Sequence, residues 1–66
     1  MAREYLYRLT FTADYFTLNT INKGKNEEEA AKNAASFMLD HYGMDLGSLG
    51  AYLEEGESEK IEEVKS

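Results

Sequence analysis

Six glutamates gather near the carboxyl end of the chain, where their spacing suits the binding of positive charge. They are Glu54, Glu55, Glu57, Glu59, Glu62 and Glu63. In an extended strand, residues two apart are separated by about 6.6–7 Å, close to the spacing of successive phosphates along a nucleic acid strand. If 54–63 is extended, Glu55, Glu57 and Glu59 project on one side and imitate a short run of phosphates. A solvated edge strand, whose charges discourage sheet-to-sheet aggregation, explains the same residues equally well.

Catalytic chemistry has little support in the residue pattern. His41 is the only histidine, and no serine stands in a recognisable nucleophile elbow. The neighbouring glutamates at 54–55 and 62–63 lie in stretches without an apolar pocket. Such a pocket would be needed to raise a carboxyl pKa for acid–base catalysis. A histidine on the flank of a helix is more often packed or half-exposed than catalytic. We therefore expect a protein that is not an enzyme.

Metal and cofactor sites are not indicated by the residue types. The chain has no cysteine and a single histidine, which leaves disulfides, thiolate sites and multi-histidine sites out of reach. A calcium loop counted from Asp45 would place Gly47, Leu49 and Gly56 at ligand positions, and none of these supplies a side-chain oxygen. The segment NKGKN offers one glycine before a helix, which is weak for cradling phosphate. We expect no cofactor.

The net charge of −6 is unevenly distributed along the 66 residues. Residues 1–25 carry four basic and two acidic side chains, a net charge of +2, whereas residues 26–66 carry eleven acidic and three basic ones, a net charge of −8. An acidic body repels nucleic acid and attracts basic partners. We expect a protein partner with a basic surface and no direct binding to nucleic acid. The alternative is that the charge only maintains solubility, which net charges of about 2–8 favour in a small domain.

The length indicates a single domain over residues 1–66, with a core that supplies about 3–5 kcal/mol of net stability. No apolar run approaches the roughly 20 residues that span a bilayer, and the amino-terminal segment does not read as a signal peptide. A chain without cysteine suits a reducing compartment. These features favour a cytoplasmic protein with no membrane partner.

Two β-rich runs open the chain. Residues 3–12 alternate with period two, which predicts a half-buried strand with Tyr5, Tyr7, Leu9 and Phe11 on one side and Leu6, Arg8, Thr10 and Thr12 on the other. A second run follows at 15–22, with Phe16 and Leu18 in phase. Ile21 is out of phase with them, so we expect a bulge or a strand end near Asn19. The short connection predicts an antiparallel hairpin.

A helix is predicted over 26–43. Asn26 is a suitable N-cap, and Glu29, three residues later, completes an arrangement like a capping box. Glu27 and Glu28 also lie at the positive end of the helix dipole, which favours anions. Gly24 in the preceding loop is free to take a positive φ. Gly43 is suited to a left-handed residue that ends the helix.

The apolar residues of this helix form one stripe at 100° per residue. The stripe contains Ala31, Ala34, Ala35, Met38 and Tyr42, flanked by Ala30, Phe37, Leu39 and His41, and the opposite side contains Glu29, Lys32, Asn33, Ser36 and Asp40. Alanines in its first half allow close approach to a sheet, and larger residues follow. This gradient predicts a helix that crosses a twisted sheet diagonally.

The final third of the chain carries a weaker pattern. MDLGSLGAYL predicts an apolar loop or a short strand folded back on the core. EKIEEVKS suits a strand with Ile61 inward, or a helical turn with Ile61 and Val64 on one side. The strand is preferred, because two strands and a helix alone are marginal in water. The expected fold is a small α+β domain of order β-β-α-β, an antiparallel sheet with one helix packed on one face.

Five tyrosines and three phenylalanines are many for so short a chain. We expect Leu6 and Tyr15 to emerge on the side of the hairpin away from the core. Large aromatic side chains are favoured anchors of protein interfaces. A small core that needs large side chains explains the same composition.

A hairpin, then NEEEAAKNAASFMLDHYG, then an acidic carboxyl-terminal strand resembles the layout of small phage-encoded inhibitors of bacterial RNA polymerase and of acidic anti-CRISPR proteins. The resemblance implies a cytoplasmic protein of a bacterial host that blocks a basic nucleic-acid-binding site without catalysis. The six carboxyl-terminal glutamates, with Glu27, Glu28 and Tyr15, would then contact the partner. The alternative function is a small structural or assembly protein that forms a homodimer through its hairpin.

Overall fold

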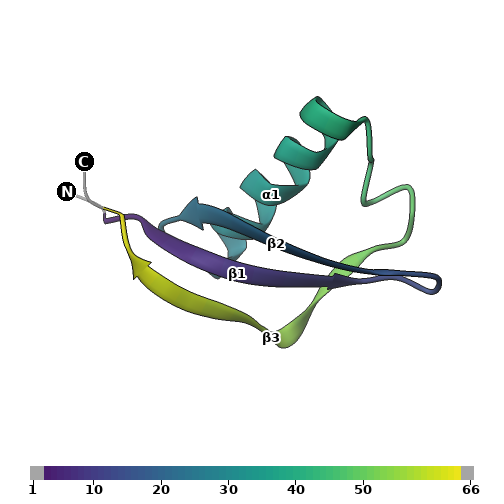
Figure 1. Ribbon diagram of the computed structural model, residues 1–66. Coiled ribbons are helices and arrows are strands. Elements are labelled where there is room, and N and C mark those ends of the chain that lie inside the picture. The colour runs from purple at the N-terminus through teal and green to yellow at the C-terminus, as the bar shows by residue number, and fades with distance from the viewer. Residues whose placement is uncertain (1–2, 65–66) are drawn as a thin grey trace.

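The structure, a computed structural model, describes residues 3–64, apart from the side chains of residues 54–57. Its elements in chain order are β1 (Tyr5–Thr12), β2 (Thr17–Gly24), α1 (Glu27–Tyr42) and β3 (Tyr52–Glu63). The strands form one antiparallel sheet in the order β2-β1-β3, and α1 lies over one face of it (Figure 1). The predicted α+β fold of order β-β-α-β is confirmed.

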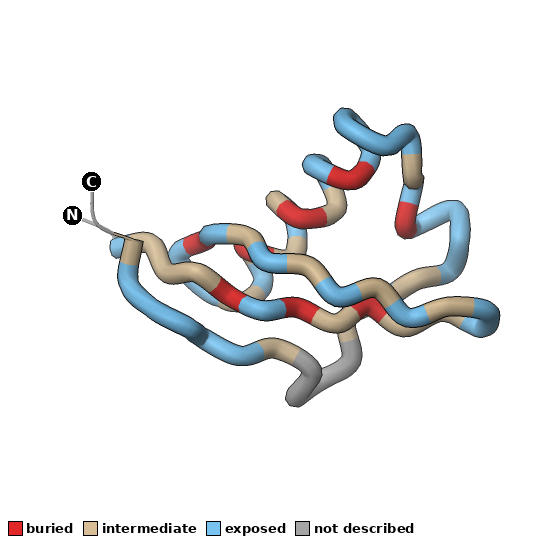
Figure 2. The backbone as a smooth tube through the Cα atoms, in the orientation of Figure 1, coloured by how far each residue is buried: buried red, intermediate tan, exposed pale blue. Residues whose placement is uncertain are grey.

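The central strand β1 provides most of the strand side chains in the core. Tyr7, Leu9 and Phe11 are buried on the side that faces α1, and Leu9 is completely enclosed. Buried and more accessible positions alternate along this strand (Figure 2), as the period-two pattern predicts. Tyr5 packs against the same cluster from the end of the strand.

The hairpin of β1 and β2 is regular from end to end. Its pairing runs without a shift from Thr12 opposite Thr17 to Tyr5 opposite Gly24. The expected bulge or strand end near Asn19 is therefore wrong. Ile21 is out of phase because it lies on the sheet face that α1 does not cover, where 55% of its surface stays exposed.

Both ends of α1 are closed as predicted. The Asn26 side chain accepts a hydrogen bond of 2.8 Å from the amide of Glu29, and the Glu29 carboxylate in turn accepts one from the amide of Lys25. At the other end Gly43 is left-handed, with φ 66°, and its amide donates to the carbonyl of Leu39. These caps set the length of the helix.

The buried side of α1 is rotated from the predicted stripe. Ala30, Ala34 and Met38 are the buried residues. Tyr42 is 68% exposed, contrary to prediction, because the last turns of α1 rise away from the sheet (Figure 1). The loop after α1 contributes Leu46 to the core instead, as expected for an apolar loop that folds back.

Helix and sheet approach one another most closely at the start of α1. A Cβ added to Gly24 would lie 2.4 Å from the backbone nitrogen of Ala30. Gly24 is therefore required for close approach rather than for the positive φ expected from the sequence, since only Gly43 and Gly50 have positive φ among the described residues. Asn33, predicted on the solvent side, donates a hydrogen bond to the carbonyl of Lys23 and ties α1 to β2.

The third strand exists as predicted but pairs irregularly with β1. Leu9 is opposite Ser58 and Phe11 is opposite Leu53, so β3 has three more residues than β1 over this interval. A second shift occurs where Glu62 and Lys60 oppose consecutive residues of β1. Ile61 falls at this second shift and is 40% exposed rather than inward.

Candidate partner-binding surface

An open groove lies between α1 and the β3 side of the sheet. The helix packs mainly against β2 and makes few contacts with β3, so this part of the sheet is left uncovered. The groove has a volume of about 560 Å³. Its lining residues are Phe11, Glu27, Glu28, Ala31, Lys32, Ala35 and Leu53.

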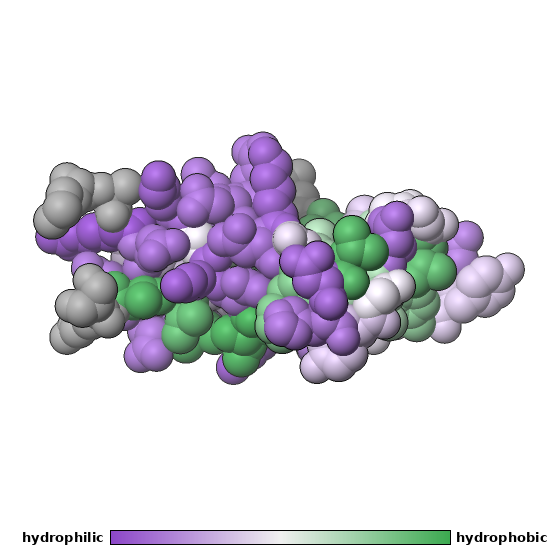
Figure 3. All heavy atoms as spheres, turned by 90° about the horizontal axis from the view of Figure 1, so that it is seen from above, coloured by the Kyte–Doolittle hydropathy of each residue, from purple (hydrophilic) through white to green (hydrophobic). Residues whose placement is uncertain are grey.

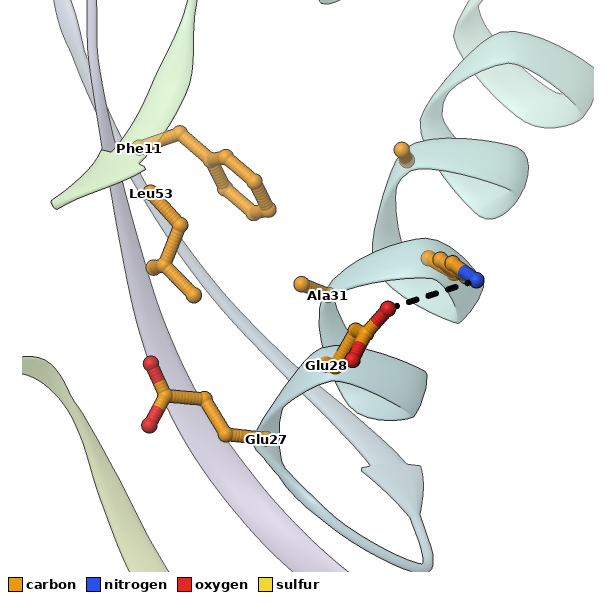
Figure 4. A pocket seen from close by; sticks show the side chains of 7 residues that line it. Phe11, Glu27, Glu28, Ala31 and Leu53 are labelled. Atoms are coloured by element: carbon orange, nitrogen blue, oxygen red, sulfur yellow. Dashed lines mark ion pairs between the residues drawn. The ribbon is translucent and has the colours of Figure 1, made fainter. Parts of the chain in front are cut away.

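The floor and one wall of the groove are apolar. Phe11 and Leu53 point from β1 and β3 towards the helix, and Ala31 faces them from α1 (Figure 4). Ala35 lies one turn further along the same wall. Because alanine side chains are short, the helix wall recedes and the groove stays open.

Two glutamates from the first turn of α1 stand at the rim of this groove. Glu28 forms an ion pair of 3.6 Å with Lys32, and both side chains are largely exposed. Glu27 is half-buried and extends towards the strands (Figure 4). No ion pair joins Glu27 to any side chain that the structure describes. Its negative charge is therefore available to a cation from outside.

The described glutamates of β3 are largely paired with basic residues of the same chain. Glu59 lies 2.8 Å from the guanidinium of Arg8, and Glu63 lies 3.7 Å from that of Arg3. Glu62 lines a shallow hollow beside Lys23. The positive charge of the first 25 residues is thus folded against the acidic carboxyl-terminal strand.

The structure describes only part of the predicted series of carboxylates. Glu62 and Glu63 oppose consecutive residues of β1, Leu6 and Tyr5, so they lie on opposite faces of the sheet. The side chains of the three remaining predicted residues, Glu54, Glu55 and Glu57, lie outside the described part of the chain. The structure thus brings Glu27 and Glu28 together at the groove, while Glu59 and Glu63 each lie beside an arginine.

The predicted anchor Tyr15 stands apart from the groove. It lies in the turn between β1 and β2 and is 98% exposed. Leu6, predicted on the uncovered face, is half-buried.

In Figure 3, hydrophilic residues prevail over the half of the molecule that carries the termini, and hydrophobic ones are more frequent over the other half.

A second exposed aromatic group, which was not predicted as a candidate site, lies at the end of α1. The rings of Phe37 and His41 stack with centroids 4.2 Å apart, and Tyr42 meets Phe37 edge-on at 6.0 Å. The spacing of four residues between Phe37 and His41 is the signal that predicts such contact on a helix. All three side chains are exposed, and the stack places no base beside a nucleophile.

One carboxylate in the loop after α1 has a shifted pKa. The Ser48 hydroxyl and then the Ser48 amide donate hydrogen bonds to Asp45, at 2.9 and 3.3 Å, and hold the pKa of Asp45 below its usual value. Asp45 is exposed and closes a local turn. Within the described residues, no group of three or more histidine or acidic side chains is placed to hold a metal ion.

No helix in the described part of the chain has the length and apolar character to cross a membrane. No family model, no curated protein and no solved structure matches the chain.

Proposed function

We propose that this protein is a non-catalytic protein-binding module whose partner carries a basic surface. The observation that supports this function best is the groove between α1 and β3. There an apolar floor lies beside the carboxylate of Glu27, which forms no ion pair with a described side chain. The acidic balance of residues 26–66 adds long-range attraction for a basic partner. The same charge opposes direct binding to nucleic acid.

The partner in this proposal is a nucleic-acid-processing protein of a bacterial host, and the module inhibits it in the cytoplasm by covering its nucleic-acid site. The resemblance of the sequence layout to that of small phage inhibitors supports this role. A basic channel that accepts phosphates also attracts clustered carboxylates, so competition needs no catalytic step. Two acidic groups are candidates for this contact: the rim of the groove, and the carboxyl-terminal strand, in which Glu59 and Glu63 are already paired with arginines.

Affinity capture with immobilised protein from a bacterial lysate tests this function. At low salt we expect one or a few basic proteins to be retained and then released as salt rises. The variant Glu27→Lys/Glu28→Lys should lose them. The matched control Asp14→Lys/Asp40→Lys makes the same change in net charge at exposed positions outside the groove and should retain them. Equal retention by both variants, or retention indifferent to salt, contradicts the proposal.

Charge reversal in the carboxyl-terminal strand separates the two acidic groups. If imitation of phosphates by β3 contributes, reversal at Glu55, Glu57 and Glu59 abolishes capture. If capture survives this change but not reversal at Glu27 and Glu28, the groove carries the interaction and the imitation of phosphates is excluded.

Self-association is the second candidate function, and the hairpin supports it. Tyr15 is almost fully exposed at the hairpin tip, and Ile21 is more than half exposed on the edge strand β2. Light scattering at micromolar concentration should then give the mass of a dimer, reduced to that of a monomer by Tyr15→Ser. A strict monomer at these concentrations removes this candidate.

A further inference from the structure

The groove between α1 and β3 is more specific in its chemistry than an acidic surface. Its floor is formed by Phe11 and Leu53, and its helix wall by Ala31 and Ala35. An apolar hollow of this size lies within the range of about 300–1,000 Å³ that is typical of ligand sites. Charge alone would not fill such a hollow, because a hydrated cation gains nothing from an apolar floor. The occupant must therefore carry apolar side chains.

The rim of the groove adds a requirement for positive charge. Glu27 is half-buried at the start of α1 and has no cationic partner among the described side chains. Glu28 is already paired with Lys32, which also lines the groove. A lysine or arginine beside the apolar contact would complete the pairing of Glu27 in a partly desolvated position, where a charge pair is worth more than at an open surface.

The conformation of the occupant follows from the neighbouring strand. An extended segment would have to add to the free edge of β3, but this strand contains two register shifts and a dense run of glutamates. Bulges and charges on an edge oppose the addition of another strand. A helix laid in the groove needs no backbone pairing and presents apolar side chains one turn apart.

We infer that this groove binds an amphipathic helix of the partner, with aliphatic side chains on Phe11 and Leu53 and a lysine or arginine on Glu27. The inference rests on the proposed function and names the segment of the partner that the module recognises. It distinguishes the groove, as the site of recognition, from the acidic surface that assists encounter.

A synthetic peptide tests this inference without the natural partner. The probe is a helix-forming peptide of alanine, leucine and lysine, with leucines one turn apart on one face and lysines at the edges of that face. Nitrogen-15 NMR titration of the whole protein should shift the amides of Phe11, Ala31, Ala35 and Leu53, and leave those of the hairpin turn unchanged. Shifts centred elsewhere, or no binding, overturn the inference.

Two variants locate the contact, each with a matched control. Ala35→Gln fills the groove without changing the charge. It should lower the affinity for the peptide by about tenfold or more, as truncations at the centre of an interface do. Ser36→Gln, on the exposed side of α1, should not. Glu27→Gln should lower the affinity for the peptide by about two- to fivefold, with Asp40→Asn as its control. Unchanged affinity in Glu27→Gln and in a folded Ala35→Gln overturns the inference.

A second peptide separates this inference from the proposed function. In this peptide every leucine is replaced by serine, so that only the positive charge remains. If it binds as tightly as the first, the groove is not the site, whereas capture of a basic protein that depends on Glu27 and Glu28 still supports the function. If the leucine peptide binds in the groove but no lysate protein is released by salt, the function fails and the groove stands.

Discussion

Leu53 of β3 is the direct cross-strand partner of Phe11 of β1, and both side chains face α1 from the part of the sheet that the helix leaves open. The pair owes its position to two irregularities. The helix packs towards β2, and β3 contains a register shift between Leu53 and Ser58 that places Leu53 opposite Phe11. Phe11 is buried, but a sheet fully covered by its helix would also have buried Leu53, and the groove would not exist.

Truncation of Leu53 should lower both the free energy of unfolding and the affinity of the groove for its occupant. Leu53→Ala should lower the free energy of unfolding by about 1–2 kcal/mol, which is less than the 2–5 kcal/mol typical of a fully buried leucine, because Leu53 is only half-buried. Leu49→Ala is the control, since Leu49 lies in the loop after α1, does not pack against the core cluster and is more exposed than Leu53. Urea unfolding gives both values. Equal losses in the two variants would show that Leu53 has no special place in the core.

The contact between Gly24 and α1 predicts a larger effect from a single methyl group. In Gly24→Ala the new Cβ meets the backbone of Ala30 and Glu29 at 2.4–2.9 Å, and backbone atoms cannot turn aside. The variant should be less stable by about 1–3 kcal/mol. In Gly47→Ala the nearest atom is a side-chain oxygen of Asp45 at 3.5 Å, an ordinary contact. Thermal unfolding should show a lower midpoint temperature in the first variant only. An unchanged midpoint temperature in Gly24→Ala would refute the close approach.

Loss of Arg8 should strengthen the binding of a basic partner. The pair of Arg8 with Glu59 is exposed on both sides, so Arg8→Ala should change the free energy of unfolding by no more than about 1 kcal/mol. It also releases Glu59 and makes the net charge more negative by one. We expect affinity at low salt to rise by about two- to fivefold. Lys25→Ala, which makes the same change in net charge at a loop position without an ion pair to a described side chain, should have a smaller effect; weaker binding in Arg8→Ala would mean that this arginine contacts the partner.

The turn around Asp45 should respond to acid in a defined direction. Because the Ser48 hydroxyl and amide lower the pKa of Asp45 in the folded protein, its contribution to stability is present above the ordinary value of 3.8 and disappears as pH falls through the lower folded value. Carbon-13 NMR of the side-chain carboxyl should show a midpoint below 3.8. Ser48→Ala should move the midpoint upwards, and Ser36→Ala should leave it in place. A midpoint at or above 3.8 in the unaltered protein contradicts the hydrogen bonds of this turn.

Local signals in the sequence predicted most of the fold. The alternation from Tyr5 to Phe11 and the two caps at Asn26 and Gly43 depend on residues close together in the chain, and the structure has all of them. Their physical causes, period-two exposure and the satisfaction of helix ends, operate over a few residues. Such features need no knowledge of the tertiary arrangement.

The features that the sequence did not predict arise from the placement of whole elements. The rotation of α1 that buries Ala30 and exposes Tyr42 depends on the contact with Gly24 and on the angle between helix and sheet. An apolar stripe on a helix defines a side only to within a residue or two. The same rotation places Ala31 and Ala35 at the edge of the core rather than at its centre. They therefore line the groove.

The candidate site was predicted only in part for the same reason. Glu27 and Glu28 were predicted from charge, and they stand at the rim of the groove. The pairing of Glu59 and Glu63 with Arg8 and Arg3 joins residues that are more than fifty positions apart in the chain. No local pattern indicates such partners, because the order β2-β1-β3 is decided only when the third strand docks.

The affinity of the captured partner across a series of salt concentrations tests the central claim most directly, measured by calorimetric titration with the purified protein. Because the claim requires carboxylates at the groove to pair with cations of the partner, the affinity should fall steeply as salt rises. Glu27→Lys/Glu28→Lys should bind weakly at low salt and with a flatter dependence. An affinity that is the same at low and high salt, in the unaltered protein, would contradict the account.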